Sequence, residues 1–389
     1  MSVRVLSISQ LYPGLSTPGQ GIFIHRRLQG LPDPHRVRVW RVRPWFPLLR
    51  SASVPSREEV DGTPVEDVPF LYLPGMFKGM DGSMLLRALR RRPTDGIDVL
   101  DAHFAYPTGW AAVRLGKERG LPTVVTLRGT EEPYSKDPAR RRRIEETVRD
   151  ADRVIAVSSS LARLAVECGA DPDRVRVVGN GVDPIRFVPA DDGQRRAARA
   201  RLGLPADASV LLTVGGLAER KGVGRVIDLL PRLASSRPSL IYLVAGGGGP
   251  EGDERGALER RAQDLGVQDR VWFLGQLPPD ELPQVYQASD AFVLATRNEG
   301  WANALHEAIA CGLPSVATDV GGNREVLGDG AAGILVPFGD ADALREAIEG
   351  VFDGALDPGT VAAIGRSRTW SIVGEETAQV LRAARGMGS

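Results

Sequence analysis

Short apolar runs alternate along the chain with longer segments in which apolar residues recur at helical spacing. This alternation predicts β-α-β units whose strands form parallel sheets. In the first half, the predicted strands are Val3–Ser9, Val37–Val42, Asp98–Asp101, Thr123–Thr126, Arg153–Val157 and Val175–Val178. The predicted helices between them are Ile22–Leu28, Gly109–Arg119, Pro138–Arg149 and Leu161–Cys168. The polar segment Arg50–Asp61, which contains Pro55, predicts a surface loop.

The alternation starts again after a turn at Asn180-Gly181-Val182-Asp183, where we place the linker between two domains. The second half has predicted strands at Val210–Val214, Leu240–Ala245, Val271–Leu274, Ala291–Ala295, Ser315–Ala317 and Gly333–Val336. Its predicted helices are Gly222–Ala234, Glu254–Leu265, Pro279–Gln287, Asn303–Ala310 and Ala341–Phe352, and the tail predicts one more, Trp370–Ala384. No repeat of fixed period is visible.

The length of 389 residues exceeds the size at which a single hydrophobic core keeps growing. Together with the linker, it predicts one α/β domain over residues 1–183 and a second over residues 184–369. Open parallel sheets bind ligands outside the carboxyl ends of their strands. We therefore expect the chemistry at the segments that follow strands.

The formal net charge is zero, but residues 1–183 carry 28 Lys and Arg against 22 Asp and Glu. This modest excess is consistent with an anionic partner and equally with a solvated basic surface. The basic residues are not interleaved with aromatic ones, so no nucleic acid partner is predicted.

Only two cysteines occur, Cys168 and Cys311, without the spacing of a disulfide framework or of a metal site. This fits a reducing compartment. No signal peptide is recognised at the N-terminus, and no apolar run approaches the roughly 18 residues that a membrane span needs. We expect a cytoplasmic protein, at most peripheral at the inner face of the membrane.

The segment from Glu299 to Glu307 lies between a strand and a helix. It sets one carboxylate at each end of a helix N-terminus, where backbone N–H groups and a partial positive charge are presented. Such a site suits a ligand with both phosphates and hydroxyls, because amides bind phosphates and carboxylates bind hydroxyls. The pair alone also fits an ordinary helix start with solvated acids.

With the continuation Cys311 to Asp319, this segment resembles the E-x7-E signature of the retaining glycosyltransferases of family 4. The resemblance implies the GT-B architecture, in which two Rossmann-like domains with parallel sheets face each other across a cleft. It also implies that a helix at 370–389 completes the N-terminal domain. In that family the second Glu, here Glu307, binds the ribose of the donor nucleotide, and the first, Glu299, lies beside the donor sugar.

The diphosphate of such a donor needs positive charge as it leaves. The segment Val214 to Gly222 follows a strand and supplies Arg220 and Lys221. The family usually has Gly-Arg-Leu at the strand end, but Gly216 stands here at the position of that Arg. Whether Arg220 replaces it is left open. The first helical amides after Glu299, those of Asn303, Ala304 and Leu305, complete the expected phosphate contacts.

Two further loops are expected to contact the donor. The glycine-rich loop from Gly14 to Gly21 opens a helix, and glycine lets a backbone approach a ligand closely. Family members have such a loop here, which makes Gly21 a candidate, although a plain turn explains it as well. Gln276 and Leu277 follow the strand from Val271, where the family places the nucleotide base.

In the first half, His103 ends a strand in the segment Asp101-Ala102-His103-Phe104. The family has a His in this loop that contacts the donor sugar, so His103 is a candidate catalytic residue; a structural histidine is the alternative. Arg128 and Glu131 follow the next strand and are candidates for the acceptor side.

We therefore predict a retaining, metal-independent hexosyltransferase without cofactor, with a nucleoside-diphosphate sugar as donor and a sugar or lipid-linked glycan as acceptor. Polysaccharide or glycolipid biosynthesis is the expected setting. The arginine clusters Arg90–Arg92 and Arg140–Arg143 suggest contact with anionic membrane, or a solvated helix face. A non-catalytic nucleotide-sugar binder and a GT-B epimerase are the alternatives. The sequence leaves open the sugar, the base, the acceptor and the oligomeric state.

Overall fold

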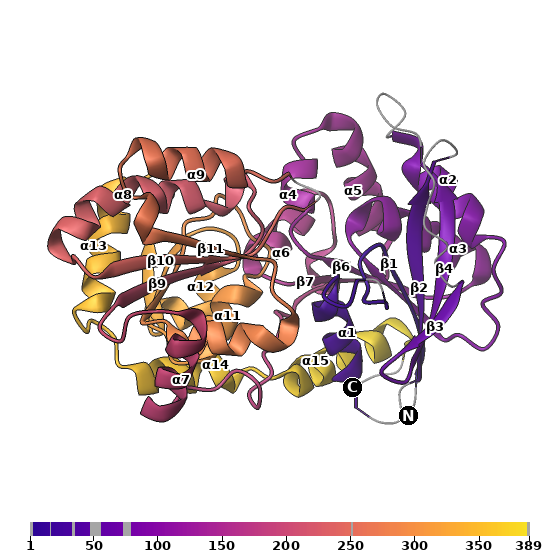
Figure 1. The fold of residues 1–389 in the computed structure, drawn as a ribbon. Helices are drawn as coiled ribbons and strands as arrows, with labels where there is room; N and C mark the ends of the chain where they lie inside the picture. Colours follow the sequence, from indigo (N-terminus) through magenta and orange to yellow (C-terminus); the bar gives the residue numbers. More distant parts are fainter. Residues whose placement is uncertain are drawn as a thin grey trace. The chain divides into compact units, whose positions relative to one another are not determined.

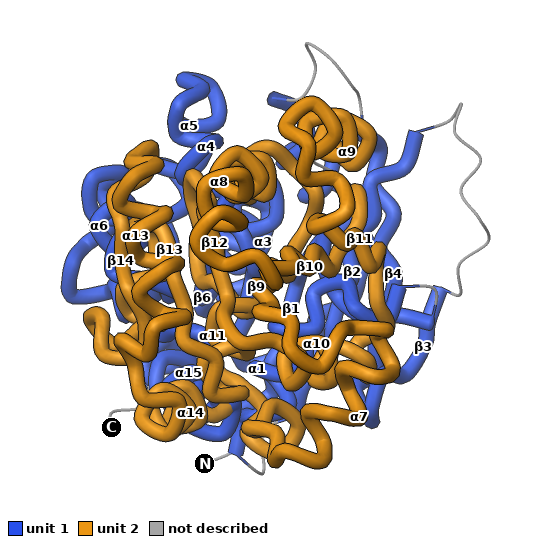
Figure 2. Tube along the Cα trace, turned by 60° about the vertical axis from the view of Figure 1, so that its left-hand side comes forward, with its two compact units in different colours: residues 1–180, 370–389 blue, residues 181–369 orange. Residues whose placement is uncertain are grey.

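The computed structural model describes residues 3–15, 17–32, 36–46, 56–72, 79–249 and 252–386. The chain divides into two compact units (Figure 2). Unit 1 comprises Met1–Asn180 and Trp370–Ser389, and unit 2 comprises Gly181–Thr369. The sequence-based boundary lay at residue 183, inside the first turn of unit 2.

Unit 1 is built on an eight-stranded sheet with the strand order β3-β4-β2-β1-β5-β6-β7-β8 (Figure 1). All neighbouring strands run parallel except β3 and β4. The strands are β1 Arg4–Ser9, β2 Arg36–Trp45, β3 Arg57–Val60, β4 Thr63–Leu71, β5 Val99–His103, β6 Thr123–Leu127, β7 Arg153–Ala156 and β8 Val175–Val177. The loop prediction for Arg50–Asp61 is therefore wrong for Arg57–Val60, while residues 50–55 lie outside the described residues.

The helices of unit 1 include one from the far end of the chain. In the described ranges the α-helices are α1 Ile22–Gln29, α2 Asp81–Leu89, α3 Trp110–Arg119, α4 Glu131–Tyr134, α5 Pro138–Asp150, α6 Ser159–Glu167 and α15 Trp370–Ala384, and a short π-helix, Ala105–Gly109, precedes α3. Helix α15 lies beside α1 (Figure 1), and Figure 2 colours its residues with unit 1. Its residues Val373, Val380 and Leu381 join a core cluster with strand residues of the sheet.

Unit 2 has a six-stranded parallel sheet with the order β11-β10-β9-β12-β13-β14. Its strands are β9 Ser209–Val214, β10 Leu240–Ala245, β11 Val271–Gly275, β12 Ala291–Leu294, β13 Ser315–Thr318 and β14 Gly333–Val336. Its helices are α7 Asp192–Leu202, α8 Val223–Ser236, α9 Arg255–Asp264, α10 Leu282–Ala288, α11 Asn303–Ala310, α12 Asn323–Val326, α13 Ala341–Phe352 and α14 Pro358–Ser367. Two clusters of buried apolar residues use alternate residues of these strands, one cluster for each face of the sheet.

In both sheets the strand order reverses once, between β1 and β5 in unit 1 and between β9 and β12 in unit 2. Ligands of open parallel sheets bind at such reversal points, outside the carboxyl ends of the strands. In unit 1 this point lies beside His103, the last residue of β5. In unit 2 it lies beside the glycines after β9 and the segment after β12, which leads to Glu299. The fold thus places the predicted residues at the two edges where ligands are expected.

Candidate functional site

The carboxyl edge of the unit 2 sheet is formed by segments that touch through glycines. A Cβ added to Gly246 would lie 1.8 Å from the carbonyl oxygen of Gly215. One added to Gly222 would lie 1.9 Å from the oxygen of Ala295, and one added to Gly321 only 1.7 Å from that of Glu299. Only glycine permits these approaches. The segments that follow β9, β10, β12 and β13 are therefore in direct backbone contact and form one continuous platform around Glu299.

Glu299 lies at the centre of a charged cluster on this platform. Its carboxylate oxygen Oε1 accepts from Nζ of Lys221 at 2.6 Å and from the hydroxyl of Thr296 at 3.3 Å. Nη1 of Arg220 lies 3.6 Å from the same oxygen and donates to the carbonyl of Asn298 at 3.2 Å. The side chain of Glu299 is 10% exposed and that of Lys221 20% exposed. Glu299, Lys221 and Arg220, all predicted as catalytic residues, are thus brought together at one edge.

Glu307 lies on the second turn of α11 and is held by a buried tyrosine. The hydroxyl of Tyr286 donates to Oε2 of Glu307 at 3.0 Å. Burial and the nearby carboxylate of Glu307 raise the pKa of Tyr286 well above its ordinary value, so the phenol stays protonated and donates. Tyr286 was not predicted, because nothing in the sequence around it differs from an ordinary core tyrosine.

The start of α11 follows Ala302, whose side chain cannot cap the helix. Leu305 is fully buried in the core, so it can meet a ligand only through its backbone. Asn303 and Ala304 are partly exposed. The amide groups of this first turn and the side chain of Glu307 belong to the same short helix, as the sequence predicted.

The remaining donor-side candidates in unit 2 lie on neighbouring strand ends. Gln276 is exposed directly after β11, while Leu277 packs partly against the core. Gly216 follows β9, and a Cβ there would find only the oxygen of Gly247, at 3.7 Å. Lys221 is close by, because a Cβ on Gly215 would lie 3.9 Å from its Cδ. Gly216 therefore admits a side chain, unlike Gly222, Gly246 and Gly321.

In unit 1, the ring of His103 is fully buried and both of its nitrogens are hydrogen bonded. Nε2 lies 3.0 Å from the hydroxyl of Ser7 and 3.2 Å from Oδ2 of Asp101, and Nδ1 lies 3.2 Å from Nε of Arg128. Burial lowers the pKa of His103 to about 4, so the imidazole is neutral near pH 7. The contact of His103 with a donor sugar stays a prediction.

Arg128 lies at the carboxyl end of β6 and is held from several sides. Besides His103, its guanidinium contacts the side-chain oxygen of Asn180 through Nη1 at 3.1 Å and the ring of Phe23, whose centroid is 5.0 Å away. Its Nη2 is buried without a hydrogen-bond partner among the described residues. A buried donor without a partner is costly. The acceptor-side role of Arg128 stays a prediction.

Glu131, the other acceptor-side candidate, has a different environment. Its side chain accepts the backbone N–H groups of Ala105 at 2.9 Å, Arg128 at 3.0 Å and Gly129 at 2.9 Å. The residue is only 1% exposed. Glu131 thus fixes the loop that carries Arg128, and its own carboxylate does not face solvent.

Gly21 precedes α1 with a φ of +70°. A Cβ at this position would lie 2.5 Å from the carbonyl carbon of Leu11. The glycine is therefore required by the turn itself, and its contact with the donor stays a prediction.

Several residues of the unit 1 site were not assigned from the sequence. Asp101 could have been found, since it lies two positions before His103 and shares its face of β5. Ser7, Arg27 and Thr377 could not, because only the sheet and the helix crossing bring them near His103.

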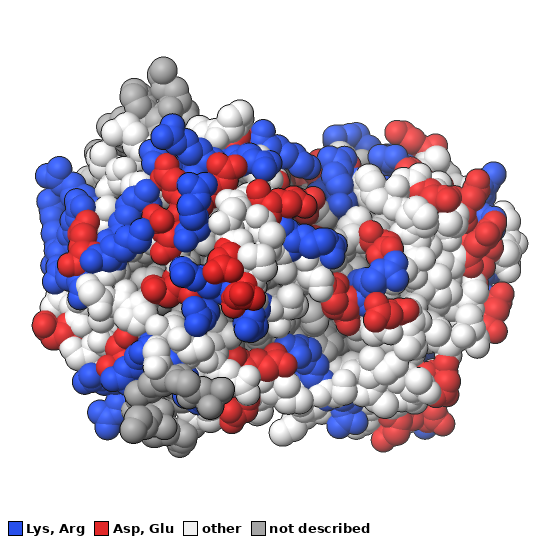
Figure 3. All heavy atoms as spheres, turned by 180° about the vertical axis from the view of Figure 1, so that it is seen from behind, with Lys and Arg blue, Asp and Glu red and all other residues white. Residues whose placement is uncertain are grey.

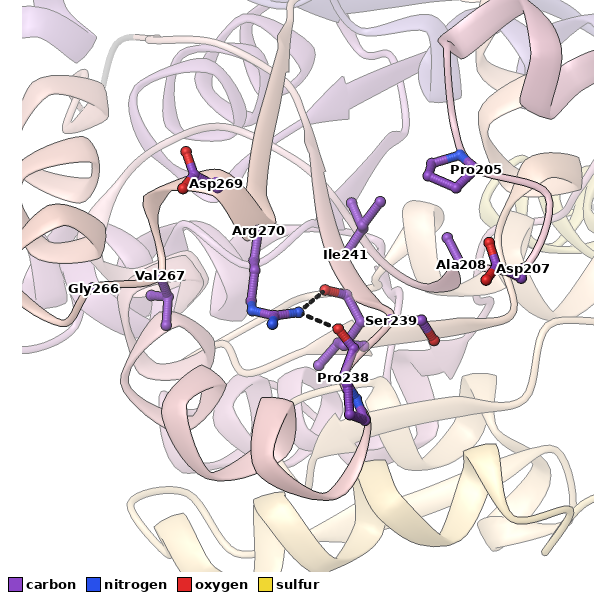
Figure 4. A pocket seen from close by; sticks show the side chains of 11 residues that line it. Pro205, Asp207, Ala208, Pro238, Ser239, Ile241, Gly266, Val267, Asp269 and Arg270 are labelled. Carbon is purple, nitrogen blue, oxygen red and sulfur yellow. Dashed lines mark hydrogen bonds between the residues drawn. The ribbon is translucent and has the colours of Figure 1, made fainter.

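Among the described residues, no group of three or more His, Cys, Asp or Glu side chains could hold a metal ion. A hollow of about 510 Å³ lies at the opposite, amino edge of the unit 2 sheet (Figure 4). Its arginine, Arg270, donates to the carbonyl oxygens of Pro238 and Leu240. The hollow is therefore separate from the Glu299 platform. The side chain of Arg270 is already bonded to backbone carbonyl groups in the wall of the hollow.

The arginine clusters are largely paired with acids. Arg90 bonds Glu118 at 2.5 Å, and Arg92 pairs with Glu66. On α5, Arg141 to Arg143 pair with Glu145 and Glu146 at 3.0 to 3.4 Å. Figure 3 shows basic and acidic side chains side by side over much of one face. Contact with an anionic membrane stays a prediction, and no helix in the described ranges is long and apolar enough to cross one.

Comparisons with known proteins identify the family and the class of fold. The family described as Glycosyltransferase Family 4 matches residues 18–186, and that described as Glycosyl transferases group 1 matches residues 194–358. A D-inositol 3-phosphate glycosyltransferase from Acidothermus cellulolyticus is 32% identical over 322 residues, which cover 78% of this chain and 69% of that relative.

Solved structures resemble the whole chain. Sucrose-phosphate synthase from Thermosynechococcus elongatus has a TM-score of 0.81 at 22% identity, covering 98% of each chain. The Anabaena protein HepE, in complex with UDP and glucose, has a TM-score of 0.76 at 19% identity, covering 98% of this chain and 100% of that one. These likenesses confirm the predicted GT-B class of fold.

Proposed function

Because the chain belongs to glycosyltransferase family 4, we propose that it transfers a hexosyl group from a nucleoside-diphosphate sugar to a hydroxyl group, with retention of configuration. The cluster of Glu299, Lys221 and Arg220 carries this proposal. It joins two cations and one carboxylate at the strand-order reversal of unit 2, and Glu299 shortly precedes α11 in the chain. A donor needs these same groups for its phosphates and its sugar hydroxyls.

The diphosphate would be stabilised by Lys221, Arg220 and the amides that begin α11. An ammonium group has three donors, so Lys221 keeps its bond to Glu299 while it contacts a phosphate oxygen. As the bond from the sugar to the diphosphate breaks, negative charge grows on the leaving group, and fixed cations stabilise this change. The protein's own cations offset this charge, and the proposal therefore invokes no metal and no cofactor.

Glu307 would accept hydrogen bonds from the hydroxyl groups of the nucleotide ribose, and Tyr286 would fix the orientation of its carboxylate. Glu299 would do the same for the sugar. The leaving diphosphate would take the proton of the attacking hydroxyl on the same face of the sugar, which gives retention without a separate general base. Water has to be excluded for transfer to outcompete hydrolysis.

For the acceptor, we infer a polyol or sugar that carries a phosphate. The relative from Acidothermus is named for D-inositol 3-phosphate, and Arg128 offers a buried guanidinium nitrogen without a partner among the described residues. A guanidinium binds phosphate in a fixed, planar geometry. This inference replaces the broader expectation of a sugar or lipid-linked glycan acceptor.

The first test is donor binding, measured as the shift in melting temperature with UDP, GDP, ADP and their common sugar conjugates. A ligand that binds only the folded state raises the melting temperature. We expect one nucleotide to give a clear shift that is abolished in Glu307→Ala. Glu346→Ala serves as the matched control, since Glu346 is 69% exposed on α13. Equal shifts in melting temperature in Glu307→Ala and the wild type would show that Glu307 does not bind the donor.

The second test is transfer from that donor to D-inositol 3-phosphate or to free inositol, with the anomeric configuration of the product read by NMR. We expect transfer to the phosphorylated acceptor with the α configuration of the donor kept. A product with inverted configuration would contradict the proposed retention. Equal turnover of both acceptors would contradict the inference that the acceptor carries a phosphate.

A further inference from the structure

The buried ring of His103 is part of a continuous chain of hydrogen bonds in unit 1, because the hydroxyl of Ser7 bonds Nε2 of the ring at 3.0 Å and donates to Oδ2 of Asp101 at 3.3 Å. Asp101 and His103 project from the same face of β5, and Oδ1 of Asp101 accepts from Nη2 of Arg27 at 3.2 Å. Arg27 lies on α1 and is 2% exposed. The Asp101 side chain is fully buried, as is that of His103. No solvent therefore reaches any bond between these three residues.

The chemistry of arginine determines which nitrogen of His103 carries the proton. An arginine side chain has only donors, so Nδ1 of His103 has to accept the N–H of Arg128 Nε. The proton of a neutral ring then resides on Nε2, which faces Oδ2 of Asp101 at 3.2 Å. Asp101 and Arg128 thus require the same tautomer.

Arg27 is itself fixed by two hydroxyl groups. Its Nη1 donates to the hydroxyl of Thr126 on β6 at 2.7 Å, and its Nε donates to that of Thr377 on α15 at 3.2 Å. The helices α1 and α15 cross closely here. A Cβ on Gly374 would lie 1.7 Å from the oxygen of Gly30, and one on Gly30 would lie 2.1 Å from that of Trp370. The position of Arg27 therefore depends on how α15 packs on α1.

We propose that His103 is a positioning residue, and that the chain from Thr377 through Arg27, Asp101 and His103 holds Arg128 in the orientation that receives the acceptor. In this arrangement the imidazole neither takes nor gives a proton during the reaction. It presents a lone pair to Arg128 Nε, so that Nη2 keeps its direction. The role of Arg128 toward the acceptor rests on the proposed function, whereas the chain of hydrogen bonds does not.

The charged groups that face the ring support a fixed, neutral imidazole. They are Asp101 on its own strand, Arg27 from α1 and Arg128 from the segment after β6, and Ser7 of β1 faces it as an uncharged partner. Asp101 raises the pKa of His103, but burial and the two arginines outweigh it and lower this pKa to about 4. The ring is therefore expected to stay neutral and in one tautomer from pH 8 down to pH 5.5.

The direct test is the imidazole ¹⁵N NMR spectrum of the full chain, which contains four histidines. His103→Gln assigns the resonance. We expect Nε2 of His103 to be protonated and Nδ1 to be unprotonated throughout this pH range. Protonation on Nδ1, or titration near the ordinary pKa of 6.5, would overturn the proposal.

Thr377→Val tests the remote end of the chain, since it removes the hydroxyl but keeps the shape of the side chain. We expect the His103 resonances to shift while those of His306, which lies in unit 2, do not. Thr377→Ser, which keeps the hydroxyl, should restore them. Unchanged His103 resonances in Thr377→Val would exclude α15 from the chain.

Activity separates positioning from proton transfer. In His103→Leu, Nε of Arg128 loses the nitrogen to which it donates. We expect kcat/KM for the phosphorylated acceptor to fall on the order of 100-fold, as misplaced groups do. In His103→Asn the amide oxygen lies near the position of Nδ1 and can accept from Nε of Arg128 again. We therefore expect kcat/KM to be at least ~10-fold higher in His103→Asn than in His103→Leu. Binding of the nucleoside diphosphate alone, which lacks the sugar that His103 is predicted to contact, should not change in either variant. Equal loss in both variants would favour a catalytic imidazole and overturn the proposal.

The two proposals fail separately. If no donor and acceptor pair gives transfer, the proposed function is wrong, and the NMR spectra of the wild type and Thr377→Val still decide whether the chain of hydrogen bonds exists. If transfer occurs but the NMR spectra show the other tautomer, only the positioning role is wrong.

Discussion

At the scale of single residues, the glycines at the carboxyl edge of the unit 2 sheet differ in whether they admit a side chain. Gly246, Gly222 and Gly321 each face a carbonyl oxygen within 2 Å of where a Cβ would stand, whereas Gly216 has 3.7 Å to its nearest neighbour outside the adjacent residues. The absence of the family's arginine at position 216 is therefore no consequence of crowding. The backbone there accepts a side chain, and under the proposed function this side chain and Lys221 would contact the same phosphate.

We predict that Gly216→Arg folds normally and binds the donor's nucleoside diphosphate about tenfold more tightly, because a hydrogen bond from a charged group contributes ~1.5–3 kcal/mol. The measurement is the dissociation constant by calorimetry. Gly246→Ala is the matched control, and it should lower the free energy of unfolding by about 1–3 kcal/mol or more through overpacking. Weaker binding in Gly216→Arg would mean that Arg220 already occupies the phosphate position.

At the scale of elements, α15 joins the last residues of the chain to the first helix. Its buried face carries Val373, Val380 and Leu381, and Gly374 permits the close crossing with α1. The sequence predicted the bounds of this helix, Trp370–Ala384, and also those of α11 and α13, because their apolar spacing is regular. It did not predict β4, whose prolines and acids hide the strand pattern and whose formation depends on pairing with β2 and β3.

We predict that Gly374→Ala destabilises unit 1, since its Cβ would overlap the carbonyl oxygen of Gly30. The free energy of unfolding should fall by about 1–3 kcal/mol, the usual cost of overpacking. Gln379→Ala, on the exposed face of the same helix, should change it by no more than about 0.5 kcal/mol. The test is denaturant unfolding of both variants. Similar values for the two variants would show that the helices separate at little cost.

At the scale of the whole molecule, each unit holds a buried histidine that remains neutral. His103 in unit 1 and His306 in unit 2 are both buried, and burial lowers the pKa of each to about 4. In the unfolded chain both have an ordinary pKa of about 6.5. Above pH 6.5 neither state binds the proton, so stability is unaffected. As the pH falls from 6.5 to 4, the two histidines bind protons in the unfolded state but not in the folded state, so the free energy of unfolding decreases.

We predict that each histidine lowers the free energy of unfolding by about 2 kcal/mol at pH 5 relative to pH 8. The measurement is the denaturant midpoint of each unit at both pH values. His306→Gln should reduce the pH dependence of unit 2 and leave that of unit 1 unchanged. A pH dependence that persists in unit 2 of this variant would assign it to other groups.

The sequence by itself determined the alternation of strands and helices, the linker near Asn180 and the spacing of Glu299 and Glu307, because these features are local: each depends on residues within one strand, turn and helix. The tertiary structure alone decided which distant side chains meet. Arg27 and Thr377 are 350 positions apart in the chain, and their hydrogen bond exists only because α15 packs on α1. Buried polar contacts of this kind leave no periodic pattern, since each needs one partner placed by the fold rather than a repeat along the chain.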